Sequence, residues 1–410
     1  MATIAIPLTR IRRQAVTARL TPGQSFVLLV SMAVTFLAAA SAPTPLYGVY
    51  QGQWHFSAIT TTEVFGVYAL AVLAALLVVG RLSDHIGRRP VLLGAVAAQV
   101  IALLIFAGAA GVPELFAARL IQGLSTGIAI GAMGAGMLDL DKVRGAKFNA
   151  VAPMVGTGIG SVISGAFIQY LPAPTHLIYL VLLVVFAAQA AAVLAMPETV
   201  TRKAGALASL RPTFALPGKL RGAMIAAAPA MLAAWAMAGL YGSLGPALVH
   251  RVTGSGNHIL GGSALFALAV SGAVLVAVAT DMTPRQLMLL GIAALFVGVG
   301  LTMVAATTSA TAFFLAAMVA GAGFGAAFQG ALRTVVGLAE AHERAGIISV
   351  LFVVSYVAFG LPAIAAGFLV VHTGDILTTM YIYGAVVMTL ATIAGLALLL
   401  QGRRARALEA

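Results

Sequence analysis

The chain has 410 residues, of which 61% are hydrophobic and only 8% are charged, and its formal net charge is +12. A water-soluble protein of this length needs far more polar surface, so the composition excludes one and favours an integral membrane protein. The absence of cysteine excludes disulfides and thiolate metal sites. In a membrane protein the excess of basic residues is an orientation signal, and no nucleic-acid partner is expected.

Apolar segments of about 20 residues are long enough to cross a bilayer, and we predict twelve of them from the sequence. The first ends at Ala40-Ser41-Ala42, so a cleaved signal peptide is the alternative interpretation, which Pro43 disfavours. The predicted spans are residues 25–42, 58–80, 90–109, 114–138, 148–171, 175–196, 222–249, 259–280, 286–307, 311–334, 346–371 and 377–400.

The longest connection on the side of the chain termini follows the sixth span, is basic, and contains Pro212 and Pro217. It predicts an all-α integral membrane fold made of two six-helix bundles. Both termini are predicted to be cytoplasmic, because 21 of the 23 Lys and Arg residues fall on their side of the membrane. The predicted segments are the N-terminal tail 1–24, the bundle 25–197, the linker 198–221, the bundle 222–400 and the C-terminal tail 401–410.

A charged segment between the second and third spans carries the most informative motif. Residues 80–89 read Gly-Arg-Leu-Ser-Asp-His-Ile-Gly-Arg-Arg. This segment resembles the loop between helices 2 and 3 of the major facilitator superfamily of secondary membrane transporters. The resemblance implies twelve spanning helices and a loop that braces the two halves of the protein on the cytoplasmic side in one state of the cycle. The gate residues it implies are Gly80, Asp84, Gly87, Arg88 and Arg89.

The two halves show a weak internal repeat around this motif. Asp84 and Arg88 are four residues apart, so they can pair if the segment is helical. Asp281 and Arg285 repeat this spacing after the second span of the second half, without the glycines. Residues 343–346, Glu-Arg-Ala-Gly, also resemble a family element and are expected to contribute to the gate.

A second segment, which begins at Arg119 and reads Arg-Leu-Ile-Gln-Gly, resembles the helix 4 motif of the same family. The resemblance implies a role for Arg119 in proton transfer. Arg119, Gln122 and Thr126 share one helix face by their spacing, and we expect this polar stripe to line a cavity. The alternative is a structural arginine that binds backbone carbonyls.

Glu63 lies in the second span at a depth similar to that of Arg119. Ionisable groups inside a bilayer are costly and often functional. A carboxylate that meets and leaves an arginine during the cycle would bind and release a proton, so we predict Glu63 and Arg119 as the proton-coupling pair. The alternative is that Glu63 is a solvated residue near the membrane surface, which the preceding run of three threonines makes credible.

The fifth span departs from the family's drug/proton antiporters, which carry Gly-Pro, two residues, then Gly-Gly. Ser161 stands where the pattern has proline, and Ser164 replaces a glycine. Aromatic and amide side chains in other spans suggest an apolar substrate cavity, while Tyr47, Tyr50 and Trp54 are expected to form an interfacial belt. The candidate cavity residues are Gln122, Thr126, Trp235, Tyr241, Phe324, Phe328, Gln329 and Tyr356.

The resemblance and the composition together predict a secondary active transporter that works by alternating access. We expect proton-coupled export of lipophilic or amphiphilic small molecules, as in multidrug efflux, by a monomer in the inner (plasma) membrane. The alternative is proton-coupled or facilitated uptake of a small metabolite. An intramembrane enzyme is a remote alternative, because His342-Glu343 lacks the second histidine of a zinc-protease motif at Gly346. The expected partners are a small-molecule substrate, protons and membrane lipids, with no metal, no cofactor and no catalytic residue.

Overall fold

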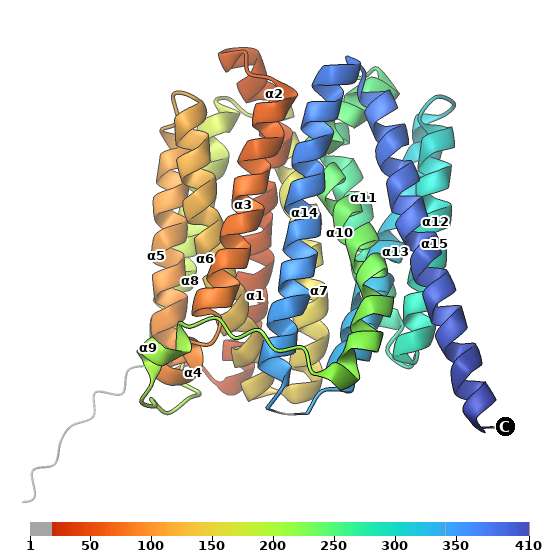
Figure 1. The fold of residues 1–410 in the computed structure, drawn as a ribbon. Coiled ribbons are helices and arrows are strands. Elements are labelled where there is room, and N and C mark those ends of the chain that lie inside the picture. The colour runs from red at the N-terminus through yellow and green to blue at the C-terminus, as the bar shows by residue number, and fades with distance from the viewer. Residues whose placement is uncertain (1–18, 341, 410) are drawn as a thin grey trace, which may run out of the picture.

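The computed structural model describes residues 19–340 and 342–409, with side chains described up to Gln401. Most of the predicted N-terminal tail and the side chains of the C-terminal tail therefore lie outside the described residues. The described chain is helical, and twelve of its helical segments are long and apolar enough to span a membrane, which confirms the predicted number of spans (Figure 1). Helices satisfy every backbone polar group internally, as a segment in lipid requires.

The first six spans and their connections occupy the chain up to Ala195, and the other six begin at Gly218. The helices before the linker are α1 (Pro22–Ser41), α2 (Pro43–Trp54), α3 (Ala58–Val79), α4 (Ser83–Ile86), α5 (Arg88–Ala107), α6 (Val112–Leu140), α7 (Lys142–Tyr170) and α8 (Pro174–Ala195). The later helices are α9 (Ala206–Ser209), α10 (Gly218–Thr253), α11 (His258–Val278), α12 (Pro284–Ala305), α13 (Ala310–Gly337), α14 (Arg344–Thr373) and α15 (Ile376–Glu409).

Each half of the chain has its own hydrophobic core. One core is built by buried residues between Phe26 and Met196, and two others are built by buried residues between Leu220 and Leu398. The halves meet where α3 packs against α14 and where α7 packs against α11. The chain crosses from one half to the other beneath the helices as an extended segment that contains the short α9 (Figure 1).

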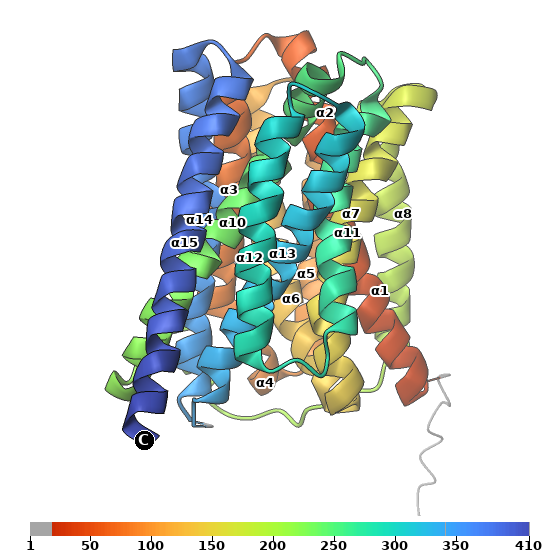
Figure 2. The same ribbon diagram turned by 90° about the vertical axis from the view of Figure 1, so that its right-hand side faces the viewer.

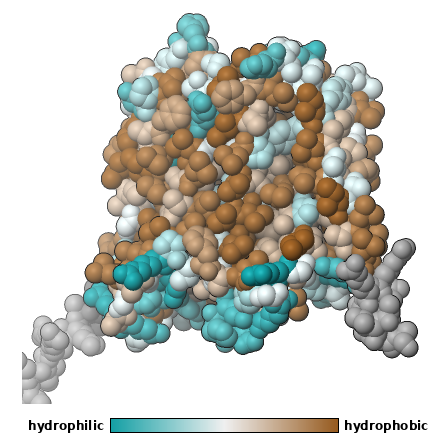
Figure 3. Space-filling view, viewed as in Figure 1, coloured by the Kyte–Doolittle hydropathy of each residue, from teal (hydrophilic) through white to brown (hydrophobic). Residues whose placement is uncertain are grey.

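The outer surface of the helices is apolar, as contact with lipid requires. Val184 and Ile225 are 70% and 71% exposed, and a hydrophobic band with polar residues at both ends covers the face in Figure 3. The described chain begins and ends at the same end of the molecule (Figures 1 and 2). We call this end the termini face, and the other end, which carries α2 and the α10–α11 connection, the opposite face.

The first span is longer than predicted, because α2 continues α1 as far as Trp54 after a junction at Ala42. The expectation that Tyr47 and Tyr50 belong to an interfacial belt is wrong, since these residues are only 2% and 1% exposed. Tyr50 stacks on Trp54 and its hydroxyl lies 3.1 Å from that of Tyr179. The α2 segment therefore turns its aromatic residues into the core.

Candidate transport site

Arg119 is fully buried inside the N-terminal half, and its polar contacts reach the first span. Its Nε donates to the Tyr47 hydroxyl at 2.8 Å, and its Nη1 donates to the Ala40 carbonyl at 2.7 Å and to Gln122 Oε1 at 2.8 Å. The structure gives it no carboxylate partner among the described residues. Three rings lie 5.1–5.9 Å from the guanidinium carbon and supply cation–π contacts; they belong to Tyr47, Tyr68 and Phe106.

The junction between α1 and α2 explains why a buried Arg–Gln pair stands here. Pro43 has no N–H, so the Ala39 carbonyl four residues earlier lacks a helical donor. Gln122 Nε2 donates to this carbonyl at 3.0 Å, while Arg119 binds the next carbonyl. The geometry therefore favours the interpretation of Arg119 as an arginine that holds backbone carbonyls.

The glycines of the helix 4 motif bring α6 against α3. A Cβ at Gly123 would lie 2.6 Å from the Tyr68 carbonyl oxygen, and one at Gly127 would lie 2.6 Å from the Val72 carbonyl oxygen. Thr126 is fully buried and donates to the Gln122 carbonyl within its own helix. The polar stripe therefore packs inside the N-terminal half, which corrects the expectation that Gln122 and Thr126 line an open cavity.

Glu63 lies on a different side of α3 from the residues that reach Arg119. It shares its helix face with Leu70 and Ala74, which are exposed at the outer surface. Glu63 is partly exposed, and the structure gives it no hydrogen bond or ion pair to Arg119. The predicted pair is not brought together here, so the geometry favours Glu63 as a solvated residue near the membrane surface.

Four of the predicted cavity residues come together in the C-terminal half. Trp235 of α10 is the centre, and its ring centroid lies 5.8 Å from that of Phe324, 5.2 Å from that of Phe328 and 5.4 Å from that of Tyr356. Phe359, which the sequence analysis did not single out, lies 5.4 Å from Trp235. We call these five residues the aromatic cluster.

The aromatic cluster faces the N-terminal half. The ring of Phe359 lies 4.8 Å from that of Phe65 in α3, and Tyr356 shares a hydrophobic cluster with Tyr68. Another predicted cavity residue, Tyr241, lies elsewhere, because it is only 1% exposed and stacks on Phe313 in the core of its own half. Gln329 directly follows Phe328 in α13 and is half-buried.

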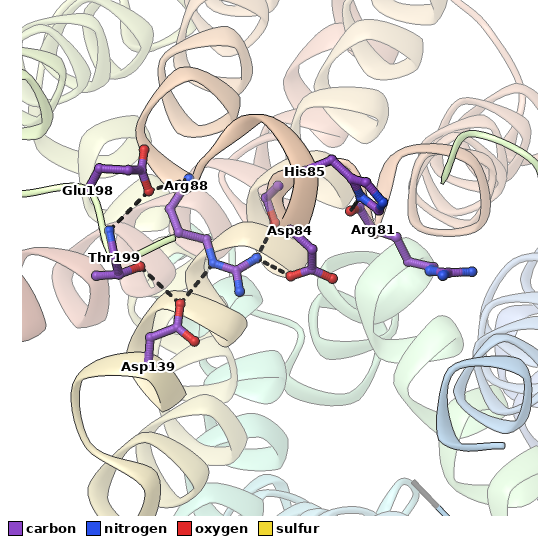
Figure 4. Close-up of polar contacts among 8 residues, drawn as sticks. Arg81, Asp84, His85, Arg88, Asp139, Glu198 and Thr199 are labelled. Carbon is purple, nitrogen blue, oxygen red and sulfur yellow. Dashed lines mark hydrogen bonds and ion pairs between the residues drawn. The ribbon is translucent and has the colours of Figure 1, made fainter. Parts of the chain in front are cut away.

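The motif loop at residues 80–89 folds into the short helix α4 and a network of charges on the termini face (Figure 4). Arg88 is 5% exposed. Its Nη1 donates to Ser83 Oγ at 2.6 Å and to Asp84 Oδ1 at 2.5 Å, and its Nε donates to Asp139 Oδ2 at 3.0 Å. The predicted Asp84–Arg88 pair is therefore present. Gly131 of α6 allows close packing on Gly80, because a Cβ at Gly131 would lie 3.2 Å from the Gly80 carbonyl oxygen.

Glu198 completes this network, and the sequence analysis did not single it out. Its two carboxylate oxygens accept from the backbone N–H groups of Arg88, at 2.7 Å, and Arg89, at 3.1 Å, and so cap the start of α5. Gly87 has φ +106°, and a Cβ there would collide with the Glu198 carboxylate. The side chain of Arg89 donates to the Leu194 carbonyl.

All these contacts of Asp84, Arg88 and Arg89 are made to residues of the N-terminal half or to Glu198 at the start of the linker. The halves instead meet through small residues towards the opposite face. A Cβ at Gly360 of α14 would lie 3.2 Å from the Cβ of Ala69 in α3, and a Cβ at Gly158 of α7 would lie 2.9 Å from Val270 of α11. The bracing role implied for the motif loop stays a prediction for another state of the molecule.

The family can be assigned from these features and from comparisons with known proteins. The family model described as Major Facilitator Superfamily matches residues 26–281. The chain therefore belongs to the major facilitator superfamily, and it is a multi-pass membrane protein with the fold of that family's transporters.

Among solved structures, the chain is similar to a mutant of the nucleoside transporter NupG, with a TM-score of 0.72 and 13% sequence identity. The match covers 91% of this chain and 99% of the other, and at this identity it speaks for the fold alone. A search of curated proteins gave no match.

Proposed function

We propose that this protein is a secondary active transporter that exports lipophilic or amphiphilic small molecules in exchange for protons, by alternating access between the two faces. The observation that carries the proposal is the aromatic cluster. Its five rings gather around Trp235 and reach Phe65 of the other half. Aromatic surface between two bundles suits the apolar body of a substrate, and it would be divided when the halves separate.

The proposed energy source for transport follows from a motif that the sequence lacks. The sequence contains no Gly-Lys-Ser/Thr phosphate-binding loop, so an ion gradient is the expected source and the proton gradient is our candidate. A second candidate is uptake of a small metabolite with a planar ring. It is supported by the same aromatic rings, on which a heterocycle can stack, and by the structural likeness to a nucleoside transporter.

Transport assays in proteoliposomes test the proposal and separate these candidates. We expect lipophilic compounds to accumulate against a gradient when a pH difference is imposed, and to stop when an ionophore collapses it. Trp235→Ala should raise KM about tenfold, because a buried aromatic contact of about 1.4 kcal/mol is lost. Trp54→Ala, which removes the chain's other tryptophan, should not change KM. Transport that needs no pH difference would favour facilitated uptake.

Alternating access can be tested with a disulfide across the seam, because the chain has no native cysteine. Ala69→Cys with Gly360→Cys joins α3 to α14 at a Cβ separation near that of a disulfide. Oxidation should stop transport, a reductant should restore it, and either single variant should transport in both conditions. Full transport by the cross-linked protein would contradict alternating access through this seam.

The coupling role of Glu63 has its own test. Because Glu63 faces away from Arg119, we expect Glu63→Gln to keep proton-driven transport within about twofold, whereas Arg119→Gln should abolish it by releasing the α1–α2 junction. Uptake of substrate and of protons would be measured together. If Glu63→Gln uncouples proton flux from substrate flux, the predicted coupling pair forms in another state of the cycle.

A further inference from the structure

A cavity of about 400 Å³ lies at the opposite face between the two halves of the molecule. Its walls come from α2 and α3 on one side and, on the other, from α10, α11, the connection between them, and single residues of α14 and α15. We call it the opposite-face cavity. Its polar lining residues include Thr44, Gln51, Thr61, Ser243, His250 and Asn257.

The floor of the cavity is a contact between the halves. Thr44 Oγ1 of α2 donates to the Gly242 carbonyl of α10 at 2.8 Å, and Thr44 is only 2% exposed. Tyr47, which also lines the cavity, accepts a hydrogen bond from Arg119 through its hydroxyl group. Gln51 Nε2 donates to Thr61 Oγ1 at 2.9 Å and fixes the wall formed by α2 and α3. The N-terminal wall is thus held by internal bonds, while the cavity itself requires both halves.

The lining is mostly apolar, with polar side chains interspersed among its apolar residues. It offers hydroxyl, amide and imidazole groups, and no Asp, Glu, Lys or Arg is among its lining residues. Such groups both donate and accept hydrogen bonds, but they supply no fixed charge to balance an ion. The volume lies within the range of small-molecule sites, roughly 300–1,000 Å³. A small uncharged molecule with an apolar body and a few hydroxyl or amide groups fits this chemistry.

A ligand of this cavity would act on the conformational equilibrium. Alternating access requires the halves to separate at this face, and separation would split the lining between them. A molecule that contacts both walls binds only while this face is closed, so its binding energy favours the closed state. We infer that the opposite-face cavity is an inhibitory site, at which a small uncharged molecule with an apolar body and a few hydrogen-bonding groups holds the halves together and slows transport. This inference rests on the alternating access proposed above.

Covalent adducts in the cavity test the inference without a known ligand. Ala247 is exposed and lines the cavity, and the chain has no other thiol to react. Ala247→Cys would be labelled with methanethiosulfonates that carry a hydroxyethyl, a sulfonatoethyl or a trimethylammonioethyl group. The matched control is Thr307→Cys, an exposed position on the α12–α13 connection away from the cavity.

We expect the hydroxyethyl adduct at position 247 to lower transport about tenfold, which corresponds to about 1.4 kcal/mol in favour of the closed state. The same adduct should raise the midpoint of thermal unfolding, because it adds contacts between the halves. The two charged adducts should raise the midpoint less, and adducts at position 307 should change neither quantity. The transport rate of each labelled protein would be compared with that of the same variant before labelling.

Two results would overturn the inference. One is full transport with the hydroxyethyl adduct in place, and the other is slower transport with a lowered unfolding midpoint, which would show a wedge that forces the halves apart. If the unmodified protein moves no compound at all, the proposed function fails. The unfolding midpoints of the three adducts would still report whether the cavity holds a neutral group.

Discussion

The two halves of the molecule connect their second and third spans in different ways. In the N-terminal half, residues 80–87 fold into α4 around Arg88, which is 5% exposed. In the C-terminal half, the corresponding connection is a short turn, and Arg285 is exposed with a single 3.3 Å hydrogen bond to the Leu398 carbonyl. Asp281 is also exposed and forms no ion pair with Arg285 among the described contacts.

The difference follows from glycine. Gly87 takes φ +106°, a conformation that side chains rarely adopt, and so leaves room for the Glu198 carboxylate at the start of α5. The C-terminal half has no glycine at this place, and Thr283 starts α12 instead through a capping box with Gln286. An Asp and an Arg four residues apart therefore suffice for a polar turn, whereas a buried network needs the glycine and acidic residues from elsewhere in the chain.

The largest expected effect is the loss of Arg88. Arg88→Gln leaves Asp84 and Asp139 without their shared cation, and we expect a loss of about 2–3 kcal/mol in the free energy of unfolding, since both partners keep some solvent. Arg285→Gln, at the corresponding place, should stay within about 0.5 kcal/mol. Denaturation in detergent would measure the free energy of unfolding of both variants. Equal losses would show that the two connections contribute equally to stability, against this prediction.

A smaller effect is expected for Gly87→Ala. The alanine must adopt a backbone conformation that is nearly restricted to glycine, and its methyl group must displace the Glu198 carboxylate. We expect these two effects to cost about 2 kcal/mol. Gly94→Ala in α5, the helix that begins directly after Gly87, is the control. A Cβ at Gly94 meets nothing within 4 Å, so this variant should be neutral or gain up to about 1 kcal/mol.

The double variant Gly87→Ala with Glu198→Ala sharpens this test. The two changes share one contact, so the double variant should lose less stability than the sum of the single variants. Strict additivity would show that the conformation of Gly87, and not its contact with Glu198, sets the cost.

The network shows how far the sequence could predict the site. The Asp84–Arg88 contact could be predicted from the spacing of four residues within a helical turn. Asp139 and Glu198 are 51 and 110 residues from Arg88 along the chain, and nothing local marks either as its partner. The twelve spans could be predicted because lipid requires long apolar helices, a demand that each segment meets by itself.

Depth in the membrane could be counted from the sequence, but the direction of each side chain was harder to predict. Glu63 and Arg119 have similar depths, yet Glu63 faces outwards. A signal was available, because the positions four, seven and eleven residues after Glu63 are all apolar and continue the lipid-facing side of α3. The role of Pro43 was also visible, as its missing N–H leaves the carbonyl that Gln122 binds.

The smallest expected effect extends the comparison to the two ends of the linker. At the first end Glu198 caps α5, and at the second Lys219 contacts the exposed Glu340 and the partly buried Glu343. The backbone N–H of Glu340, and then Lys219, lower the pKa of the Glu343 carboxyl below its ordinary value of 4.5. A carboxyl group whose pKa is lower in the folded than in the unfolded protein stabilises the fold at a pH above the unfolded-state pKa. This stabilisation is lost as the pH falls through the folded-state pKa.

We therefore expect the midpoint of thermal unfolding to fall slightly as the pH is lowered below about 5. The fall should be smaller in the Glu343→Gln variant. The slope of the midpoint against pH would be compared in detergent for the unmodified protein and for this variant. Because the Lys219 side chain is about half exposed, salt should weaken the effect, which separates this contact from the buried Arg88 network. A slope that Glu343→Gln leaves unchanged would place the acid sensitivity elsewhere and leave the second end of the linker without an electrostatic anchor.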